Sequence, residues 1–322
     1  MRRREFLIAA AAAMAPLGAR AQAAYPSKAI NWVVGFPPGG GADGVTRLVA
    51  AKLSQNIGQP VVVENRPGAS SIIAAQYVAQ AAPDGYTIWS TEQGGLIFNT
   101  ALYSKLPYDP QRDFTPISDM IRAPIVLAVN PSFPAQDLAS FVEYVRKNPG
   151  KLNYGSPGRG LAHQLAMEAF KQKAKLDIVD VQYKGIAPVV QDVVAGQIPM
   201  GPIDTVVVLP HLRSGKLRGL ASFSEKRLSA TPDVPAMGEL GYAGLEIAPI
   251  VGVVAPARTP RDIVARLNAE VVKAVRDAEV SAKLSGLGLE IIADTPEQFA
   301  FFLQEEGRRW LPFIRSLNIK LD

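Results

Sequence analysis

The sequence predicts an α/β protein built from two lobes, and three observations lead to this prediction. Short apolar runs alternate with amphipathic segments of helical period along nearly the whole chain. The length of 322 residues corresponds to two domains at ~150 residues each. The composition is 48% hydrophobic and 20% charged, which is typical of a packed globular protein and not of a disordered chain.

The first 23 residues are predicted to be a signal peptide, with cleavage near Ala21 or Ala23. Three arginines at residues 2–4 precede an apolar run over residues 8–17, which is shorter than the ~20 residues that span a bilayer. The segment from Arg3 to Leu7 also resembles a twin-arginine export signal, and Sec export stays open. Because cleavage lowers the formal charge from +5 to +2, no nucleic-acid partner is expected.

The chain contains no cysteine. This excludes disulfide scaffolds, thiolate metal sites, cysteine nucleophiles and lipid attachment through a lipobox cysteine. An exported chain without that lipid anchor is expected in the periplasm of a Gram-negative bacterium.

The first series of elements alternates strand and helix. Strands are expected at residues 29–36, 60–65 and 87–91, where short apolar runs end at turn residues. Residues 39–44 are expected to form a turn before a helix over residues 45–53, and a second helix is expected at residues 72–81. This βαβαβ order predicts a mostly parallel sheet with helices on both faces.

A second series continues the pattern. Helices are expected at residues 137–147, 161–173, 187–195 and 206–212, and the tail over 259–322 is expected to be mainly helical. Strands are expected at residues 125–130, 152–155, 179–183, 198–204, 217–222 and 289–293.

No long flexible linker separates the two series. We therefore expect the chain to cross between lobes through extended hinge segments near residues 128–131 and 246–255. The first lobe would then comprise residues 24–128 and 250–322, with the C-terminal helices packed back on it, and the second lobe residues 129–249.

A glycine-rich stretch over residues 36–44 is the most informative motif. It follows a strand and opens a helix, where unpaired N–H groups and the helix dipole bind anions without any arginine. Gly39, Gly41 and Gly44 also satisfy the spacing of a dinucleotide fingerprint, and a plain tight turn is a third interpretation. Pro37 removes a backbone donor from the approach, as does the proline after it, which weighs against the dinucleotide.

Asp43 lies at the start of the helix that follows this stretch. It is interpreted either as a carboxylate that stabilises the helix start or as a contact to a ligand donor or an ordered water.

Residues 153–164 repeat the strand–turn–helix design in the second lobe. Ser156 offers a hydroxyl, and Gly158 and Gly160 free the backbone. The G-x-S-x-G elbow is absent, so Ser156 is not expected to be a nucleophile. His163 is interpreted either as a surface or cap residue or as a ligand contact.

Polar residues also follow three other predicted strands. Thr91 and Gln93 follow the third strand, Lys184 follows the strand at 179–183, and Asp204 and Thr205 follow the strand at 198–204. Ligands of open α/β sheets bind at such strand ends. The simpler interpretations are a solvated Lys184 and a helix cap at Asp204 and Thr205.

These loops offer hydroxyls, amides and backbone N–H groups. They include no metal cluster, no pair of catalytic carboxylates and no activated nucleophile, so the sequence predicts a binding protein and not an enzyme, with no cofactor or metal.

Several motifs, in this order and spacing, give the chain a specific resemblance to a known family. They are FPPGGGAD at residues 36–43, VENRPGA at 63–69, APDGYT at 82–87, NPGKLNYGS at 148–156, YKG at 183–185 and TPDVP at 231–235. The chain resembles the Bug family (Bordetella uptake gene type), the periplasmic solute-binding proteins of tripartite tricarboxylate transporters.

The resemblance implies a type II periplasmic-binding-protein-like α/β fold. In such a fold each of two lobes carries a mixed or mostly parallel sheet flanked by helices, and the ligand cleft lies between the lobes. It also implies a small carboxylate as ligand: a di- or tricarboxylate, an acidic amino acid or an aromatic acid. The implied partners are the integral-membrane subunits of the transporter, and we expect a monomer.

The chain departs from the family pattern in the second lobe. The family's usual histidine before Leu-Ala-x-Glu falls on Gln164, with His163 one position earlier. Taking the motifs and the resemblance together, the expected ligand-binding residues are Phe36, Pro37, Gly39, Gly40, Gly41, Ala42, Asp43, Thr91, Gln93, Ser156, Gly158, Gly160, His163, Gln164, Lys184, Asp204 and Thr205.

The expected function is capture of a small carboxylate by hinge closure and its delivery to the transporter. Two other functions stay open. One is an exported dinucleotide-dependent oxidoreductase that uses the loop at residues 39–44, and the other is a ligand sensor for a membrane receptor.

Overall fold

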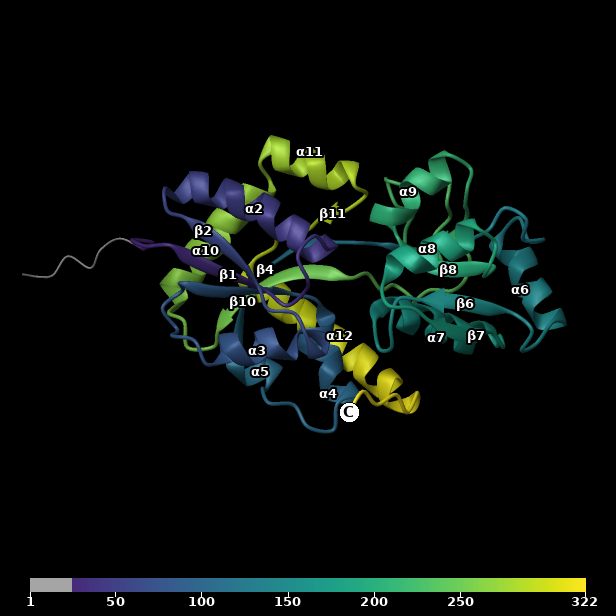
Figure 1. The fold of residues 1–322 in the computed structure, drawn as a ribbon, viewed down its shortest axis with the longest axis horizontal. Coiled ribbons are helices and arrows are strands. Elements are labelled where there is room, and N and C mark those ends of the chain that lie inside the picture. The colour runs from purple at the N-terminus through teal and green to yellow at the C-terminus, as the bar shows by residue number, and fades with distance from the viewer. Residues whose placement is uncertain (1–24) are drawn as a thin grey trace, which may run out of the picture.

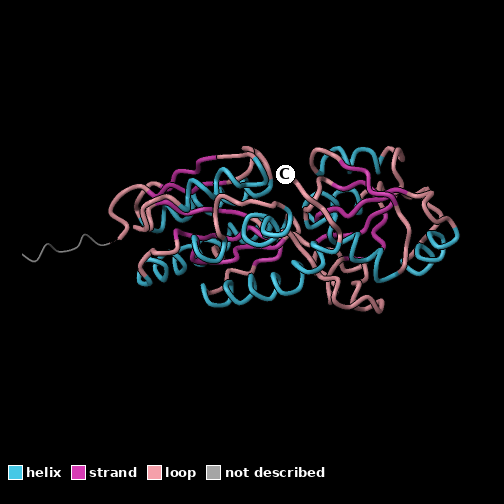
Figure 2. Tube along the Cα trace, turned by 90° about the horizontal axis from the view of Figure 1, so that it is seen from below, coloured by secondary structure: helices cyan, strands magenta, loops and turns pink. Residues whose placement is uncertain are grey.

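The structure is a computed structural model that describes residues 25–322. The predicted signal peptide of residues 1–23 lies outside the described residues. Figure 1 shows two lobes side by side, and in Figure 2 the strands of each lobe form an inner layer with helices outside. The two-lobed α/β architecture with mixed sheets is the predicted one.

The first lobe contains a mixed sheet of six strands. In spatial order these are β11 (Glu290–Ile291), β4 (Phe114–Arg122), β10 (Ile250–Pro256), β3 (Thr87–Thr91), β1 (Ile30–Val34) and β2 (Val61–Asn65). The strands β2, β1 and β3 pair in parallel, whereas β10 runs antiparallel to both β3 and β4. The carboxyl ends of β1 and β3 therefore meet at one edge of the sheet.

Helices cover both faces of this sheet. One face packs against α2 (Gly41–Ile57), α10 (Arg261–Val275) and α11 (Ala278–Gly286), and Trp32 and Ile88 point into that core. The other face packs against α3 (Ile72–Ala79), α4 (Asn99–Leu102) and α12 (Pro296–Ser316), and Val33 and Trp89 point there. The alternation along β1 and β3 places neighbouring residues on opposite faces. The short segments η1 (Ala69–Ser71), η2 (Gly94–Phe98) and α5 (Pro110–Asp113) complete the lobe.

The second lobe contains two small sheets. In the first, β5 (Ile125–Val129) lies between β8 (Met200–Asp204) and β9 (Arg218–Ser222) and runs antiparallel to both. In the second, β6 (Asn153–Ser156) pairs in parallel with β7 (Val179–Gln182). Their helices are α6 (Leu138–Lys147), α7 (Ala162–Ala174), α8 (Ile186–Val194) and α9 (Thr205–Arg213).

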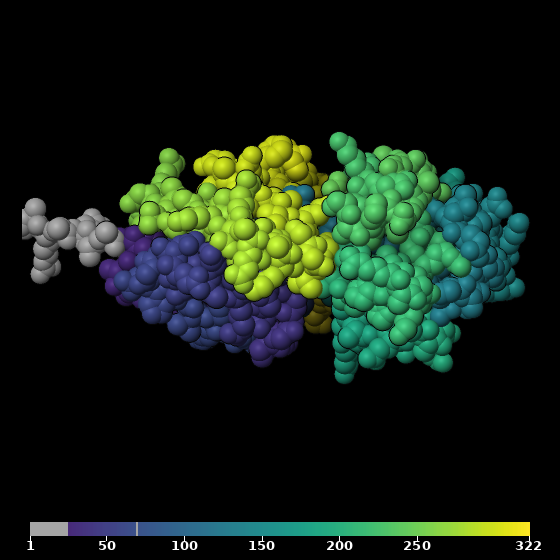
Figure 3. Space-filling model, turned by 90° about the horizontal axis from the view of Figure 1, so that it is seen from above, coloured from purple at the N-terminus to yellow at the C-terminus, as the bar shows by residue number. Residues whose placement is uncertain are grey.

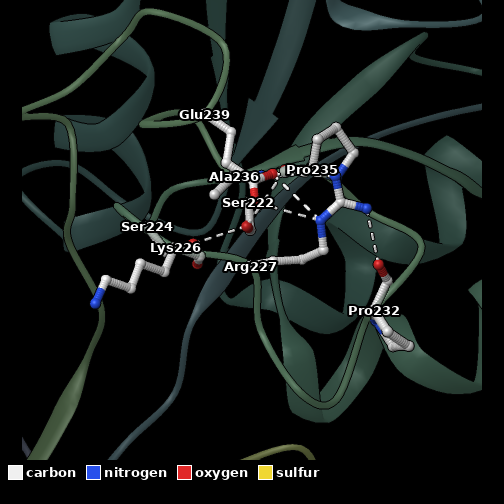
Figure 4. A network of polar contacts seen from close by, with 8 residues as sticks. All are labelled: Ser222, Ser224, Lys226, Arg227, Pro232, Pro235, Ala236 and Glu239. Atoms are coloured by element: carbon white, nitrogen blue, oxygen red, sulfur yellow. Dashed lines mark hydrogen bonds and ion pairs between the residues drawn. The ribbon is translucent and has the colours of Figure 1, made fainter.

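Polar contacts hold the long connection from β9 to β10, most of which has no regular structure (Figure 4). Arg227 donates to the carbonyl oxygen of Pro232 over 2.9 Å and pairs with Glu239, and the Glu239 carboxylate accepts from the amide of Ala236 over 3.0 Å. These contacts fold the connection on itself. The amide of Ser222 on β9 donates to the carbonyl oxygen of Pro235 over 2.9 Å, which attaches the connection to the second lobe.

The chain crosses between the lobes at positions that differ from the expected hinges. Because β4 ends at Arg122 and β5 begins at Ile125, the outgoing crossing is residues 123–124, not 128–131. Residues 128–129 lie in the central, fully buried strand of the second lobe. The return crossing precedes Ile250, so residues 250–255 of the second expected hinge belong to the buried strand β10. The amide of Ala123 donates to the carbonyl oxygen of Pro249 over 2.8 Å, which joins the two crossings.

Candidate functional site

The start of α2 carries the glycine-rich motif. The helix begins at Gly41, four residues earlier than predicted, so residues 41–44 form its first turn and not a turn before it. Its N-cap residue, Gly40, has no side chain to cap the helix, and Gly39 takes a positive φ of 83° that favours glycine. Within residues 25–322 the amides of Gly41, Ala42 and Asp43 donate to no protein acceptor. Residues 37–41 are exposed, whereas Ala42 and Asp43 are buried, so the loop that precedes these unpaired amides faces solvent.

Asp43 shapes this loop. Its side chain, only 3% exposed, accepts hydrogen bonds from the amide of Gly39 (2.8 Å), from Nε of Arg47 (3.0 Å) and from Nδ2 of Asn65 (2.8 Å). Burial opposes ionisation of the carboxyl group, but these hydrogen bonds, that of Arg47 first, hold its pKa below the usual value. The carboxylate is therefore occupied by the protein itself, and Asp43 acts as a residue that positions the loop.

The start of α7 is the second helix terminus without a side-chain cap. Its N-cap residue is Leu161, which cannot accept a hydrogen bond through its side chain. The next residues, Ala162, His163 and Gln164, are each less than 10% exposed, and their amides have no acceptor within the described part of the chain. A buried helix start normally finds partners for these donors. The geometry thus leaves a second set of amides free for an anion.

Ser156 and Gln164 both point toward Asp180 on β7. The Ser156 hydroxyl donates to Oδ1 of Asp180, and Nε2 of Gln164 donates to Oδ2, each over 2.7 Å. Oε1 of Gln164 accepts from the amide of Gly160 over 2.7 Å. These side chains were expected to contact a ligand, but their donors are used to shape the turn before α7.

His163 and Asp204 form a mostly buried pair. Nε2 of His163 lies 2.8 Å from Oδ1 of Asp204, and Nδ1 of His163 is buried without a partner. Asp204 occupies the N-cap position of α9, as predicted, but its carboxylate makes no cap hydrogen bond. His163 is buried and is not a surface residue. Burial alone would lower the pKa of His163, but the Asp204 carboxylate raises it above its usual value.

Gln93 and Thr205 fix the two crossings. Nε2 of Gln93 donates to the carbonyl oxygen of Ala248 over 2.5 Å, and its Oε1 accepts from the amide of Ile250 over 3.2 Å. The amide of Thr205 donates to the carbonyl oxygen of Pro124 over 2.8 Å, and its hydroxyl donates to the carbonyl oxygen of Gly288 over 2.7 Å. Both residues were expected to bind the ligand, and these hydrogen bonds show that they also hold the hinge.

The remaining expected residues are placed as follows. Thr91 is fully buried at the end of β3, whereas Lys184 is exposed. Phe36 is partly buried against the first-lobe core. Gly158 and Gly160 take positive φ values, and Gly160 lies against Leu102 of the first lobe. This contact places the start of α7 at the junction of the lobes, and Figure 1 shows the start of α2 at the end of its lobe that faces the other.

Glu92 is the residue that sequence reasoning did not select. It follows β3 directly, so its position at a strand end was the available signal. The carboxylate is partly buried, and within residues 25–322 it has no hydrogen-bond or ion-pair partner. Burial and the negative charge of Asp204 raise the pKa of Glu92 to about 7, although His163 opposes this.

A cavity in the first lobe lies away from both helix starts. It measures about 690 Å³, lies in the first lobe between β4 and α12, and is lined by Tyr108, Phe114 and Leu311 among others. None of the residues at the two helix starts borders it. We place the site at the helix starts because unpaired donors, and not volume, determine where an anion binds. In space-filling view the two lobes are two masses that abut one another along a visible seam (Figure 3).

Within the described residues 25–322, no helix is both long and apolar enough to cross a membrane. No group of three or more histidine, aspartate or glutamate residues in this part of the chain is arranged to hold a metal ion.

Comparison with known proteins identifies the family. The model of the family described as "Tripartite tricarboxylate transporter family receptor" matches residues 45–319. The chain belongs to this receptor family. BugT of Bordetella pertussis is 33% identical to the receptor over 98% of this chain and 96% of that protein, which confirms the resemblance to Bug proteins. A Pseudomonas sp. (strain P51) protein from the tcbD–tcbE intergenic region is 38% identical, covering 99% and 96% of the two chains.

Solved structures resemble the receptor over nearly its whole length. One described as a periplasmic transporter is 41% identical with a TM-score of 0.81, covering 93% of this chain and 100% of the other. An R. palustris protein with adipate is 34% identical with a TM-score of 0.81, covering 91% and 98%. MatC from Rhodopseudomonas palustris with bound malate is 34% identical with a TM-score of 0.78, covering 90% and 100%. These likenesses confirm the periplasmic-binding-protein fold and a binding protein, not an enzyme.

Proposed function

We propose that this protein is a periplasmic receptor that captures a small carboxylate between its lobes and delivers it to the membrane subunits of a tripartite tricarboxylate transporter. The observation that carries the proposal is the pair of uncapped helix starts, one from each lobe, at Gly41 and Ala162. Two similar proteins were solved with adipate and with malate, which supports a carboxylate as the ligand.

The amides at these helix starts replace basic side chains. A carboxylate that accepts from the amides of Gly41 and Ala42 also benefits from the positive end of the α2 dipole. Hydrogen bonds to a charged group contribute about 1.5–3 kcal/mol each. Two or three of them are enough for micromolar affinity, about −8 kcal/mol, after the costs of association.

Closure follows from contacts to both lobes. A ligand held by α2 in one lobe and α7 in the other makes its full set of hydrogen bonds only when the lobes are together, so binding shifts the protein toward the closed state. The paired crossings at Ala123 and Pro249 are the short segments about which the lobes would rotate.

The test is a thermal-shift screen of small carboxylates followed by calorimetry on wild type and Gly41→Val. A side chain at Gly41 would meet no protein atom within 4 Å, so the variant should fold normally while its side chain covers the free amides. We expect a rise in melting temperature with carboxylates for wild type and at least tenfold weaker binding for the variant.

The matched control is Gly286→Val, because Gly286 on α11 is equally open and distant in sequence from both helix starts. It should bind like wild type. The proposal fails if no small carboxylate stabilises the wild-type protein, or if Gly41→Val binds with unchanged affinity. Delivery is tested separately, by carboxylate uptake into vesicles that carry the membrane subunits, with and without the receptor.

A further inference from the structure

The side chain of Leu102, the last residue of α4, forms a contact between the two lobes. Leu102 is only 2% exposed, and it lies against Gly160 in the turn that precedes α7. A methyl group at Gly160 would lie 2.5 Å from Cδ1 and 2.9 Å from Cδ2 of Leu102, closer than carbon atoms pack. The absence of a side chain at Gly160 therefore allows the lobes to approach this closely.

Gly160 belongs to the part of the second lobe that the proposed function uses. Its amide donates to Oε1 of Gln164, in the first turn of α7, over 2.7 Å. The distance from Gly160 to the first lobe therefore also sets the distance from the first lobe to the start of α7. A ligand that bonds both lobes depends on this distance, because N–H···O hydrogen bonds span only about 2.7–3.2 Å.

Residues 320–322 hold Leu102 in place through the backbone. The amide of Leu321 donates to the carbonyl oxygen of Leu102 over 2.9 Å. Oδ1 of Asp322 accepts from the amide of Ser104 over 2.8 Å, just beyond the end of α4. The last turn of α4 is thus bonded to a segment more than 200 residues further along the chain.

The rest of α4 gives Leu102 little other support. The helix has four residues, and so short a helix is not stable by itself. Thr100 on α4 borders the cavity of about 690 Å³ and is exposed. Nζ of Lys320 donates to the carbonyl oxygen of Ala101 over 3.0 Å, which adds a third bond from residues 320–322.

We infer, resting on the proposed function, that Leu102 is a positioning residue for ligand binding. It seats on Gly160 when the lobes come together, and residues 320–322 hold it in the position that this contact requires. A group that fills the space between Leu102 and Gly160 keeps the lobes apart. Affinity then falls by the factor by which the closed population falls.

The test fills this space with Gly160→Ala. Gly160 has a φ of 71°, which strains an alanine, so the matched control is Gly215→Ala. Gly215 has a φ of 68°, and a methyl group there meets no atom within 4 Å. The control therefore carries the same backbone strain without the contact between the lobes.

A second substitution makes room again. Leu102→Ala is combined with Gly160→Ala, and the matched combination uses Leu267→Ala, because Leu267 on α10 is also 2% exposed. If the double variant with Leu102→Ala does not fold, Leu102→Val, which removes both Cδ atoms, replaces it. The melting temperature of each variant checks its fold.

The distance between the lobes is measured by pulsed electron paramagnetic resonance. Because the chain contains no cysteine, Arg112→Cys on α5 and Glu143→Cys on α6 place one spin label on each lobe. Both side chains are exposed. Distances are recorded with and without malate, and calorimetry gives the affinities for malate and adipate, the compounds present in two similar structures.

Gly160→Ala should lengthen the distances between the lobes relative to Gly215→Ala and weaken binding about fivefold or more. Leu102→Ala should reverse most of this lengthening, whereas Leu267→Ala should reverse none of it. Leu321→Pro, which removes the N–H donor to Leu102, should broaden the distance distribution.

Two results would overturn the inference. One is the same distance distribution for Gly160→Ala and Gly215→Ala, and the other is equal reversal by Leu102→Ala and Leu267→Ala. The distances without ligand decide the inference even if neither malate nor adipate binds. Failure of every small carboxylate to bind wild type would contradict the proposed function instead.

Discussion

Nε2 of His163 lies 2.8 Å from Oδ1 of Asp204, and this contact joins the first turn of α7 to the end of β8 across 41 residues of sequence. Both side chains are mostly buried, with 9% and 15% of their surfaces exposed. The pair neutralises the Asp204 carboxylate and fixes the imidazole at the uncapped start of α7.

Replacement of His163 by alanine should destabilise the protein. Loss of one partner from a buried ion pair leaves an uncompensated charge, which costs about 3–5 kcal/mol in fully buried sites and somewhat less here. At ~2–4 °C per kcal/mol for a protein of this size class, calorimetry should show a melting temperature lower by about 5 °C or more. The control is His211→Ala, because the side chain of His211, on α9, is only partly buried. Equal melting temperatures for the two variants would show that the His163–Asp204 pair contributes nothing to the stability of the fold.

Glu92→Gln should stabilise the empty protein at alkaline pH. Burial and the Asp204 charge raise the pKa of Glu92 to about 7 from an ordinary 4.5. Between these values the folded state binds more protons than the unfolded state. The free energy of unfolding of the wild-type protein therefore falls as pH rises from about 4.5 to about 7.

The raised pKa of His163 also makes wild type less stable as pH rises, but this group remains in the variant. The difference in melting temperature between Glu92→Gln and wild type should therefore be small at pH 5 and grow to several degrees by pH 8. A difference independent of pH would contradict the environment assigned to Glu92.

Asp43→Asn should weaken both the loop and carboxylate binding. The variant loses the charge-assisted hydrogen bonds from Arg47 and from the amide of Gly39. The pKa of Asp43 is lowered in the folded state, so wild type should lose this contribution as pH falls below about 4. When melting temperatures are measured over a range of pH, the variant should lack the loss of stability that wild type shows below about pH 4.

The matched control for this series is Asp84→Asn, an exposed acid whose Oδ2 lies 3.4 Å from Lys28. It should retain wild-type affinity for carboxylates. Carboxylate affinity in Asp43→Asn equal to that of the control would show that Asp43 does not position the loop.

Regular patterns in the sequence predicted most elements. The strands β1, β2 and β3 and the helices of the second lobe follow local apolar periodicity, which depends on neighbours in sequence. The strand β4 was missed because Pro116, Ser118 and Asp119 interrupt its apolar pattern. Asp294, far along the chain, satisfies the Ser118 hydroxyl and the Asp119 amide. Only the folded chain provides that partner.

The site was predicted in outline and not in its contacts. The two strand–turn–helix motifs were found because glycines and helix starts are local signals. The side-chain partners were not predicted, since they are distant in sequence. The Ser156 side chain bonds Asp180, which is 24 residues away, and the Gln93 side chain bonds the backbone of Ala248, which is 155 residues away. Such pairings depend on tertiary structure, and they give these residues a part in holding the turn and the hinge that the sequence did not predict.

The most direct test of the account follows the backbone amides themselves. In ¹H–¹⁵N spectra of deuterated protein titrated with the tightest carboxylate from the screen, the amides of Gly41, Ala42, Ala162 and Gln164 should shift downfield together with one saturation curve. Saturable binding that leaves the chemical shifts of these four amides unchanged would contradict the proposal that they hold the carboxylate.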